Sequence, residues 1–208
     1  MKELALTVLT LPLRAPAPKG NPSAGLSREA GDAAQVVERG WTQLSARAGE
    51  GDPAAANILA LAPEISLDAC RRALDEIGAE AAADDVSARI YAAALREFAA
   101  ERLHPCIGLL AALMFEADPG ADPLIGLAIC ALRLERFAEA DMLAAESIRK
   151  GSKHPRVFCV AAVCRLQAGG KSEAMDLLAL ASRLARRDPE FRDDLRIAQR
   201  LLISLHYG

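Results

Sequence analysis

The feature that most constrains the fold of this chain is a repeat of 34 residues in its C-terminal part. Small side chains recur at this spacing in three columns, which contain Ala94, Ala128 and Ala162, then Cys106, Ala140 and Ala174, then Ser147 and Ala181. Each unit is also interrupted at the same place, by residues 100–102, 134–136 and 168–170. Because antiparallel helices approach closely only where their crossing points carry small side chains, this spacing predicts stacked pairs of helices.

Composition supports helices rather than sheets. The chain has 208 residues, of which 44 are Ala, and its residues are 52% apolar but only 4% aromatic. Such a chain fits close-packed helices better than β-structure. Chance recurrence of Ala is the alternative, but it does not explain why the columns and the breaks align. Two helices in each 34-residue unit are typical of tetratricopeptide repeats. We therefore expect an all-α tetratricopeptide-repeat superhelix of three helix pairs with a C-terminal capping helix and an N-terminal helical appendage.

The positions of Pro and Gly along the chain predict its division into three parts. Pro and Gly are frequent between residues 12 and 25, which indicates a flexible or extended arm over residues 1–26. A helical region over 27–86 should follow, with one helix from Ser27 to about Ala48 and another through Leu74. The repeat domain should occupy 87–208. Its expected parts are the repeats 87–120, 121–154 and 155–188 and the capping helix 189–206.

Charge and motifs exclude several functions. The net charge of -3 and a pI near 5.7 argue against general nucleic-acid binding, which needs a basic surface. The sequence contains no nucleophile elbow, zinc-protease or phosphate-loop motif, and its three His show no metal-ligand spacing with Cys or carboxylates. We therefore expect no enzyme, catalytic residue, metal or cofactor. A hydrolase or transferase would need a site in the first 86 residues, where none is visible.

The placement of the cysteines and the hydropathy of the chain indicate the cellular compartment of the protein. The five Cys form no C-x-x-C pair and lie in apolar runs, which favours reduced core thiols in a cytoplasmic protein. No apolar run approaches 18 residues, so we expect no insertion into a membrane. The start, Met1 to Leu13, resembles a short signal sequence, but Glu3 and Pro12 argue against that interpretation.

The repeat pattern also predicts a binding surface. In a stack of this kind the first helix of each pair lines the concave face, at positions 2, 5, 9 and 12 of the repeat. Most of these positions are apolar here, which suits an extended hydrophobic segment of a partner lying in the groove. The alternative is that another part of the same chain covers them. The candidate groove residues are Tyr91, Leu95, Phe98, Ile125, Ile129, Leu132, Cys159, Val163 and Leu166.

The repeat region resembles the class II type III secretion chaperones, the tetratricopeptide chaperones of translocator proteins (the SycD/LcrH group). The resemblance covers about 87 to 203, and the order of several short segments carries it. Those segments are Ile90–Phe98, Pro123–Cys130, His154–Phe158, Gly170–Ala174 and Asp188–Phe191. The N-terminus departs from the family, which usually has only a short helical segment before the first repeat.

The resemblance implies a bacterial cytoplasmic chaperone, without ATP, that keeps hydrophobic translocators soluble before export. It implies that a short Pro-x-Leu-x-x-Pro-like segment of the translocator binds in the groove and that the protein can form a homodimer. Tyr91 and Phe98 match aromatic groove positions of the family, whereas Leu95 and Leu103 replace aromatics. Residues 11–16 retain half of the bound motif, so the arm is either a groove occupant or a flexible apolar tail. The alternative function is a general tetratricopeptide scaffold in a secretion apparatus or regulatory complex.

Overall fold

A computed structural model describes residues 33–63, 65–77, 86–115 and 123–207 of the chain. The expected arm over residues 1–26, including the candidate groove occupant, lies outside these described residues. The described residues fall into two compact units that divide between Gly126 and Leu127. Within the described ranges all regular structure is helical, so the expected all-α class is confirmed.

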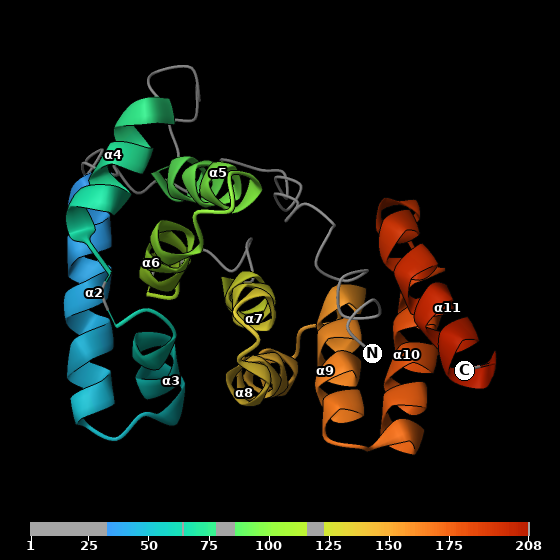
Figure 1. The fold of residues 1–208 in the computed structure, drawn as a ribbon. Helices are drawn as coiled ribbons and strands as arrows, with labels where there is room; N and C mark the ends of the chain where they lie inside the picture. Colours follow the sequence, from blue (N-terminus) through green and yellow to red (C-terminus); the bar gives the residue numbers. More distant parts are fainter. Residues whose placement is uncertain (1–32, 64, 78–85, 116–122, 208) are drawn as a thin grey trace. The chain divides into compact units, whose positions relative to one another are not determined.

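The N-terminal unit consists of helices that pack around α6 (Figure 1). Helix α6 contacts α5, α2, α4 and α3, and α5 also contacts α4. The expected helix from Ser27 is described from Ala33 onward. The bounds are α2 Ala33–Gly49, α3 Pro53–Leu61, α4 Leu67–Ile77, α5 Val86–Ala99 and α6 Leu103–Leu113.

Two places in this unit show why small residues are needed. A Cβ added to Gly40 would lie 2.6 Å from Cα of Ala112, so α2 and α6 are in backbone contact there. A Cβ added to Gly108 would lie 2.6 Å from Sγ of Cys70. The indole N–H of Trp41 donates a hydrogen bond to the carbonyl oxygen of Gly108 at 3.1 Å. The absence of side chains at these glycines therefore lets α2 and α4 approach α6.

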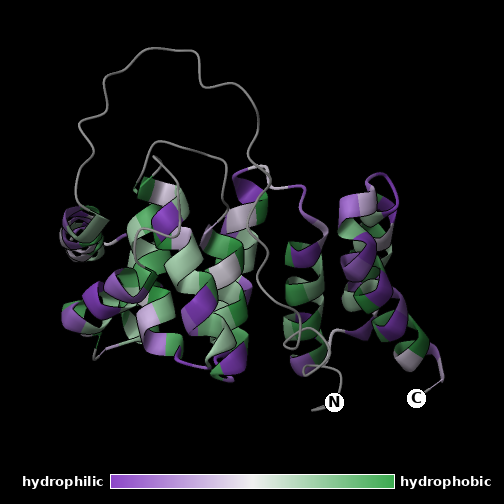
Figure 2. Cartoon of the chain, turned by 90° about the horizontal axis from the view of Figure 1, so that it is seen from above, coloured by the Kyte–Doolittle hydropathy of each residue, from purple (hydrophilic) through white to green (hydrophobic). Residues whose placement is uncertain are grey.

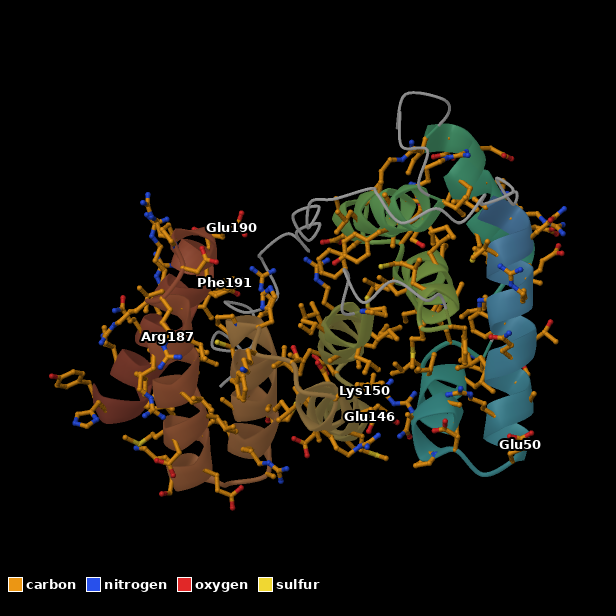
Figure 3. The ribbon with its side chains drawn as sticks, turned by 180° about the vertical axis from the view of Figure 1, so that it is seen from behind. Glu50, Glu146, Lys150, Arg187, Glu190 and Phe191 are labelled. Atoms are coloured by element: carbon orange, nitrogen blue, oxygen red, sulfur yellow. The ribbon has the colours of Figure 1, made fainter. Side chains whose placement is uncertain are left out.

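The C-terminal unit contains the rest of the repeat region. Helix α9 contacts α8, α10 and α11, and α10 contacts α11. The capping segment begins at Asp188, whose carboxylate accepts a hydrogen bond from the backbone N–H of Glu190 at 2.9 Å. Phe191, which is labelled in Figure 3, then packs edge-on against His154, with ring centroids 4.8 Å apart. Helix α7 spans Pro123–Arg133 and crosses the division; the other bounds are α8 Phe137–Arg149, α9 Pro155–Gln167, α10 Lys171–Ala185, η2 Pro189–Phe191 and α11 Arg192–Tyr207.

The turns inside the helix pairs recur at the 34-residue spacing. Glu101, Glu135 and Gly169 all have left-handed backbone conformations, with φ of 60°, 57° and 84°. The next residue in each turn donates its backbone N–H to a carbonyl five residues earlier, at 2.9, 2.9 and 2.8 Å. This hydrogen bond closes a helix at its C-terminus. The turns occur where the sequence predicts its breaks.

The small residues of the repeat lie in the core between the helices. All eight residues of the three columns, from Ala94 to Ala181, are completely buried. Figure 2 shows that most helices carry both hydrophobic and hydrophilic residues, as expected when one side packs and another faces water. The complete burial of these small residues therefore fits the close packing that the repeat predicts for its helices.

Candidate peptide-binding surface

The first group of predicted groove residues lies on one side of α5. Tyr91, Leu95 and Phe98 are four and three residues apart, so they follow one face of the helix. Tyr91 is 7% exposed and Phe98 is 3% exposed, whereas Leu95 is half-buried. The backbone carbonyl of Phe98 accepts a hydrogen bond from the N–H of Glu101 at 3.1 Å. The left-handed turn therefore fixes the end of this apolar stripe.

A charged network holds the same end of α5. The buried carboxylate of Glu97 accepts two hydrogen bonds from the guanidinium of Arg102, at 2.7 Å from Nε and 2.6 Å from Nη2. The hydrogen bond with Glu97 raises the pKa of Arg102 above its usual value. Glu76 of α4 pairs with Arg96 and lies 3.8 Å from Arg102. This bidentate pair and its neighbours tie α4, α5 and the following turn together beside Phe98.

The second group lies on α7 and α9. Ile125 is in the N-terminal unit, and Ile129 and Leu132 follow it on α7 in the C-terminal unit. Cys159, Val163 and Leu166 have the same spacing along α9 as the three residues on α5. All six of these side chains are buried. The predicted residues therefore follow one side of each of these helices, and on α7 and α9 they are buried.

A buried ion pair connects α9 to α11. Nε of Arg156 donates a hydrogen bond to Oδ1 of Asp194 at 2.6 Å, and the two side chains are 7% and 4% exposed. Asp194 lies in the first turn of α11, where a carboxylate counters the helix macrodipole. Its burial opposite Arg156 shows that it also joins two helices. Arg156 occupies position 2 of its repeat, so this pair borders the predicted groove.

The cysteines of α9 lie in this apolar surrounding. Burial, followed by the charge of Asp194, raises the pKa of the Cys159 thiol far above its ordinary value. Burial also raises the pKa of the Cys164 thiol to about 12. Both thiols are therefore protonated at neutral pH and react slowly. All five Cys of the chain are free and buried, which matches the expectation of core thiols.

A separate depression lies between α8, α9 and α10. Arg165 lies within it, 3.0 Å from a carboxylate oxygen of Asp141 and 3.8 Å from one of Glu173. Its wall contains none of the nine predicted groove residues. The lining residues are Asp141, Ala145, Ile148, Ala161, Arg165, Glu173, Asp176 and Leu177.

The described residues were also searched for membrane-spanning helices and for groups of metal ligands. None of their helices is both long and apolar enough to span a membrane. In the same part of the chain, no three His, Cys, Asp or Glu side chains are grouped so that they could hold a metal ion.

The chain was compared with known proteins. No protein-family model matches the sequence, and no curated protein matches it either. Solved structures do match. PcrH from Pseudomonas aeruginosa is 22% identical, with a TM-score of 0.54 over 60% of this chain and 94% of PcrH. PcrH in complex with the chaperone-binding region of PopD is also 22% identical, with a TM-score of 0.52 over 60% of this chain and 93% of that one.

A third match is a type III secretion complex from Aeromonas hydrophila. It is 22% identical, with a TM-score of 0.50 over 67% of this chain and 95% of the other. The likeness at this identity is one of fold, and it spans nearly all of each solved chain. The expected resemblance to the tetratricopeptide secretion chaperones is therefore confirmed at the level of the fold.

Proposed function

We propose that this protein is a cytoplasmic chaperone of a bacterial type III secretion system that binds a hydrophobic translocator. The fold shared with PcrH is the observation that carries the proposal, because PcrH in its complex binds the chaperone-binding region of PopD. In this proposal the protein is not an enzyme and needs no cofactor. Binding uses the surface of the fold and not a reaction centre.

The proposed contact surface is the set of apolar stripes on the first helix of each pair. Their residues are Tyr91, Leu95, Phe98, Ile125, Ile129, Leu132, Cys159, Val163 and Leu166. An extended segment of the translocator would lie along them, with alternate side chains in apolar pockets. Leu95 is the best probe, because it is half-buried while the other eight are buried. We also propose that the protein forms a homodimer.

Co-expression with a candidate translocator, encoded beside the gene for this chain, tests the proposal. The chaperone should keep that protein soluble and co-purify with it. Leu95→Glu should lower the amount of bound translocator at least tenfold, because a carboxylate in an apolar pocket loses its hydration. Ala99→Glu is the matched control, because Ala99 is exposed on the same helix.

The outcomes distinguish an error in the proposed function from an error in the proposed binding surface. A translocator that remains insoluble with the unaltered chaperone contradicts the chaperone function and favours the scaffold alternative. A soluble complex that Leu95→Glu leaves intact contradicts only the assignment of the surface.

A further inference from the structure

The depression between α8, α9 and α10 takes no part in the proposed groove and has apolar walls. Ile148 of α8 and Leu177 of α10 line it and are half-buried. Ala145 and Ala161 line it as well, and their short side chains leave a volume of about 410 Å³. A volume of this size is within the range of binding sites in proteins.

The lining of the depression carries more negative than positive charge. Arg165 is close to both Asp141 and Glu173, so two carboxylates already surround one guanidinium. Asp176 is a third carboxylate, which is exposed and forms no ion pair within the described residues. Three negative charges and one positive charge give the lining a net charge of -2. The depression therefore attracts a cation.

These charges distinguish the last helix pair from the preceding one. The positions 34 residues before Asp141, Arg165 and Asp176 carry apolar residues, which are Ile107, Ala131 and Met142. Ile107 and Ala131 are completely buried. Packing of the helix pairs therefore does not need charged side chains at these repeat positions, and the charged depression requires another explanation.

The outer side of α11 has the opposite charge. We define it by five exposed residues that follow one side of the helix at intervals of three or four, which are Arg192, Arg196, Arg200, Ile203 and Tyr207. Asp193 pairs with Arg196, but Arg192 and Arg200 form no ion pair within the part of the chain that the structure describes. This side therefore has a net positive charge beside two apolar side chains.

Large apolar side chains are exposed at both surfaces. Ile203 and Tyr207 are 58% and 85% exposed, and Met142 on α8 is 44% exposed. Met142 directly follows Asp141, which lines the depression. A contact that removed these side chains from water would be favourable.

A second copy of the chain brings the two surfaces together. The outer side of α11 cannot reach the depression of its own chain, because Ile197, Leu201 and Leu205 on the opposite side are buried and α11 contacts α9 and α10 (Figure 1). Both surfaces lie in the same compact unit. If each of two copies places α11 in the depression of the other, the contact occurs twice. The buried area then doubles toward the area that a stable dimer needs.

We propose that two copies of the chain form a two-fold dimer in which the outer side of α11 of each copy lies in the depression of the other. Arg200 pairs with Asp176 of the other copy, and Ile203 and Tyr207 pack between Ile148 and Leu177. This arrangement fills both depressions, so the assembly closes at two copies. The inference rests on the homodimer of the proposed function and assigns its interface, but it does not depend on the binding of a translocator.

Charge reversal tests the interface in the full chain. Asp176→Arg and Arg200→Asp should each raise the dissociation constant of the dimer about tenfold or more, because like charges then meet. A chain with both changes should dimerise again, with a dissociation constant within about threefold of the original, because each altered charge meets its opposite. Arg72→Asp is the control, because Arg72 is exposed on α4 in the other unit. Sedimentation velocity measures all four variants.

The contradicting outcomes are specific. A monomeric unaltered chain, or one that forms longer assemblies, overturns the proposal. A dimer that withstands both single changes has its interface elsewhere, which overturns it as well. A double variant that dimerises no better than the single variants shows that Asp176 and Arg200 do not pair, with the same consequence.

Cross-linking tests the contact directly and guards against indirect effects of charge. Chains with Ala145→Cys are mixed with chains with Gln199→Cys, because Ala145 lines the depression and Gln199 is exposed one turn before Ile203. A short bis-maleimide should link position 145 of one copy to position 199 of the other. The native cysteines of the chain are buried and should contribute little. Ala99→Cys in place of Ala145→Cys is the control, and equal yields from the two mixtures would overturn the proposal.

Failure of this proposal is distinguishable from failure of the proposed function. Neither experiment contains a translocator, so the results are the same whether or not the protein is a chaperone. A translocator that remains insoluble on co-expression contradicts the chaperone function and leaves the dimer interface standing.

Discussion

At the scale of single residues, the most informative feature is the ion pair between Arg156 and Asp194. Both side chains are buried, and the two residues are 38 apart in the sequence. Asp194 lies in the first turn of α11, and nothing in the neighbouring sequence marks a partner so far away. Pairing of this kind depends on how helices pack, and periodicity does not report it. The pair of Glu97 with Arg102 joins residues only five apart, and an acidic residue inside an apolar helix is a signal that could have found it.

Arg156→Ala should lower the free energy of unfolding by about 3–5 kcal/mol, because it leaves the carboxylate of Asp194 buried without its partner. The control is Arg196→Ala, which breaks the exposed pair of Arg196 with Asp193, 3.2 Å apart. That change should cost less than about 1 kcal/mol. Urea unfolding followed by circular dichroism measures both. Equal losses in the two variants would show that the buried pair has no special role.

At the scale of helices and turns, the 34-residue repeat spacing predicted more of the structure than it did at the scale of ion pairs. The 34-residue period located the turns at Glu101, Glu135 and Gly169, because each follows a helix whose small residues are in register. The period did not reveal α3, since Pro53–Leu61 is a short Ala-rich segment without the repeat pattern. The N-terminal cap of α3 is formed by neighbouring residues and can be recognised in the sequence. The carboxylate of Asp52 accepts hydrogen bonds from the N–H groups of Ala54 and Ala55.

Glu135→Gly should stabilise the protein by about 0.5–1 kcal/mol, because Glu135 has a left-handed backbone that costs a side-chain-bearing residue free energy. The reverse change at the equivalent turn, Gly169→Glu, should destabilise by a similar amount. Thermal unfolding of both variants measures the effects. A lower melting temperature for Glu135→Gly would contradict the assignment of these turns as equivalent.

Gly40→Ala should destabilise the protein by about 1–3 kcal/mol, because the new methyl group would meet the backbone of Ala112 and force α2 away from α6. Gly49→Ala is the matched control on the same helix, because nothing lies within 4 Å of a Cβ at that position. It should be neutral or stabilise by less than about 1 kcal/mol. Chemical unfolding compares the two. If Gly40→Ala is as well tolerated as Gly49→Ala, α2 and α6 are not in the close contact described.

At the scale of the whole molecule, the sequence located the helices that carry the candidate surface but not its accessibility. The positions of Tyr91, Leu95 and Phe98 on one face of α5 follow from the repeat spacing alone. Burial depends on which other segments lie against that face, and repeat spacing contains no such information. For this reason the eight buried candidates are poor choices for truncation. Phe98→Ala, for example, should reduce stability together with binding.

The central claim is that the apolar surface of the first helices binds a hydrophobic translocator. A photo-crosslinking amino acid placed at Leu95 tests it most directly, with the same amino acid at Ala99 as the control. After irradiation in the native cells, the account predicts a crosslink from position 95 to one extended segment of a long hydrophobic secretion substrate. Position 99 should give little or none of this product. Crosslinking of position 95 only to a folded, hydrophilic component of the apparatus would contradict the claim and favour a scaffold.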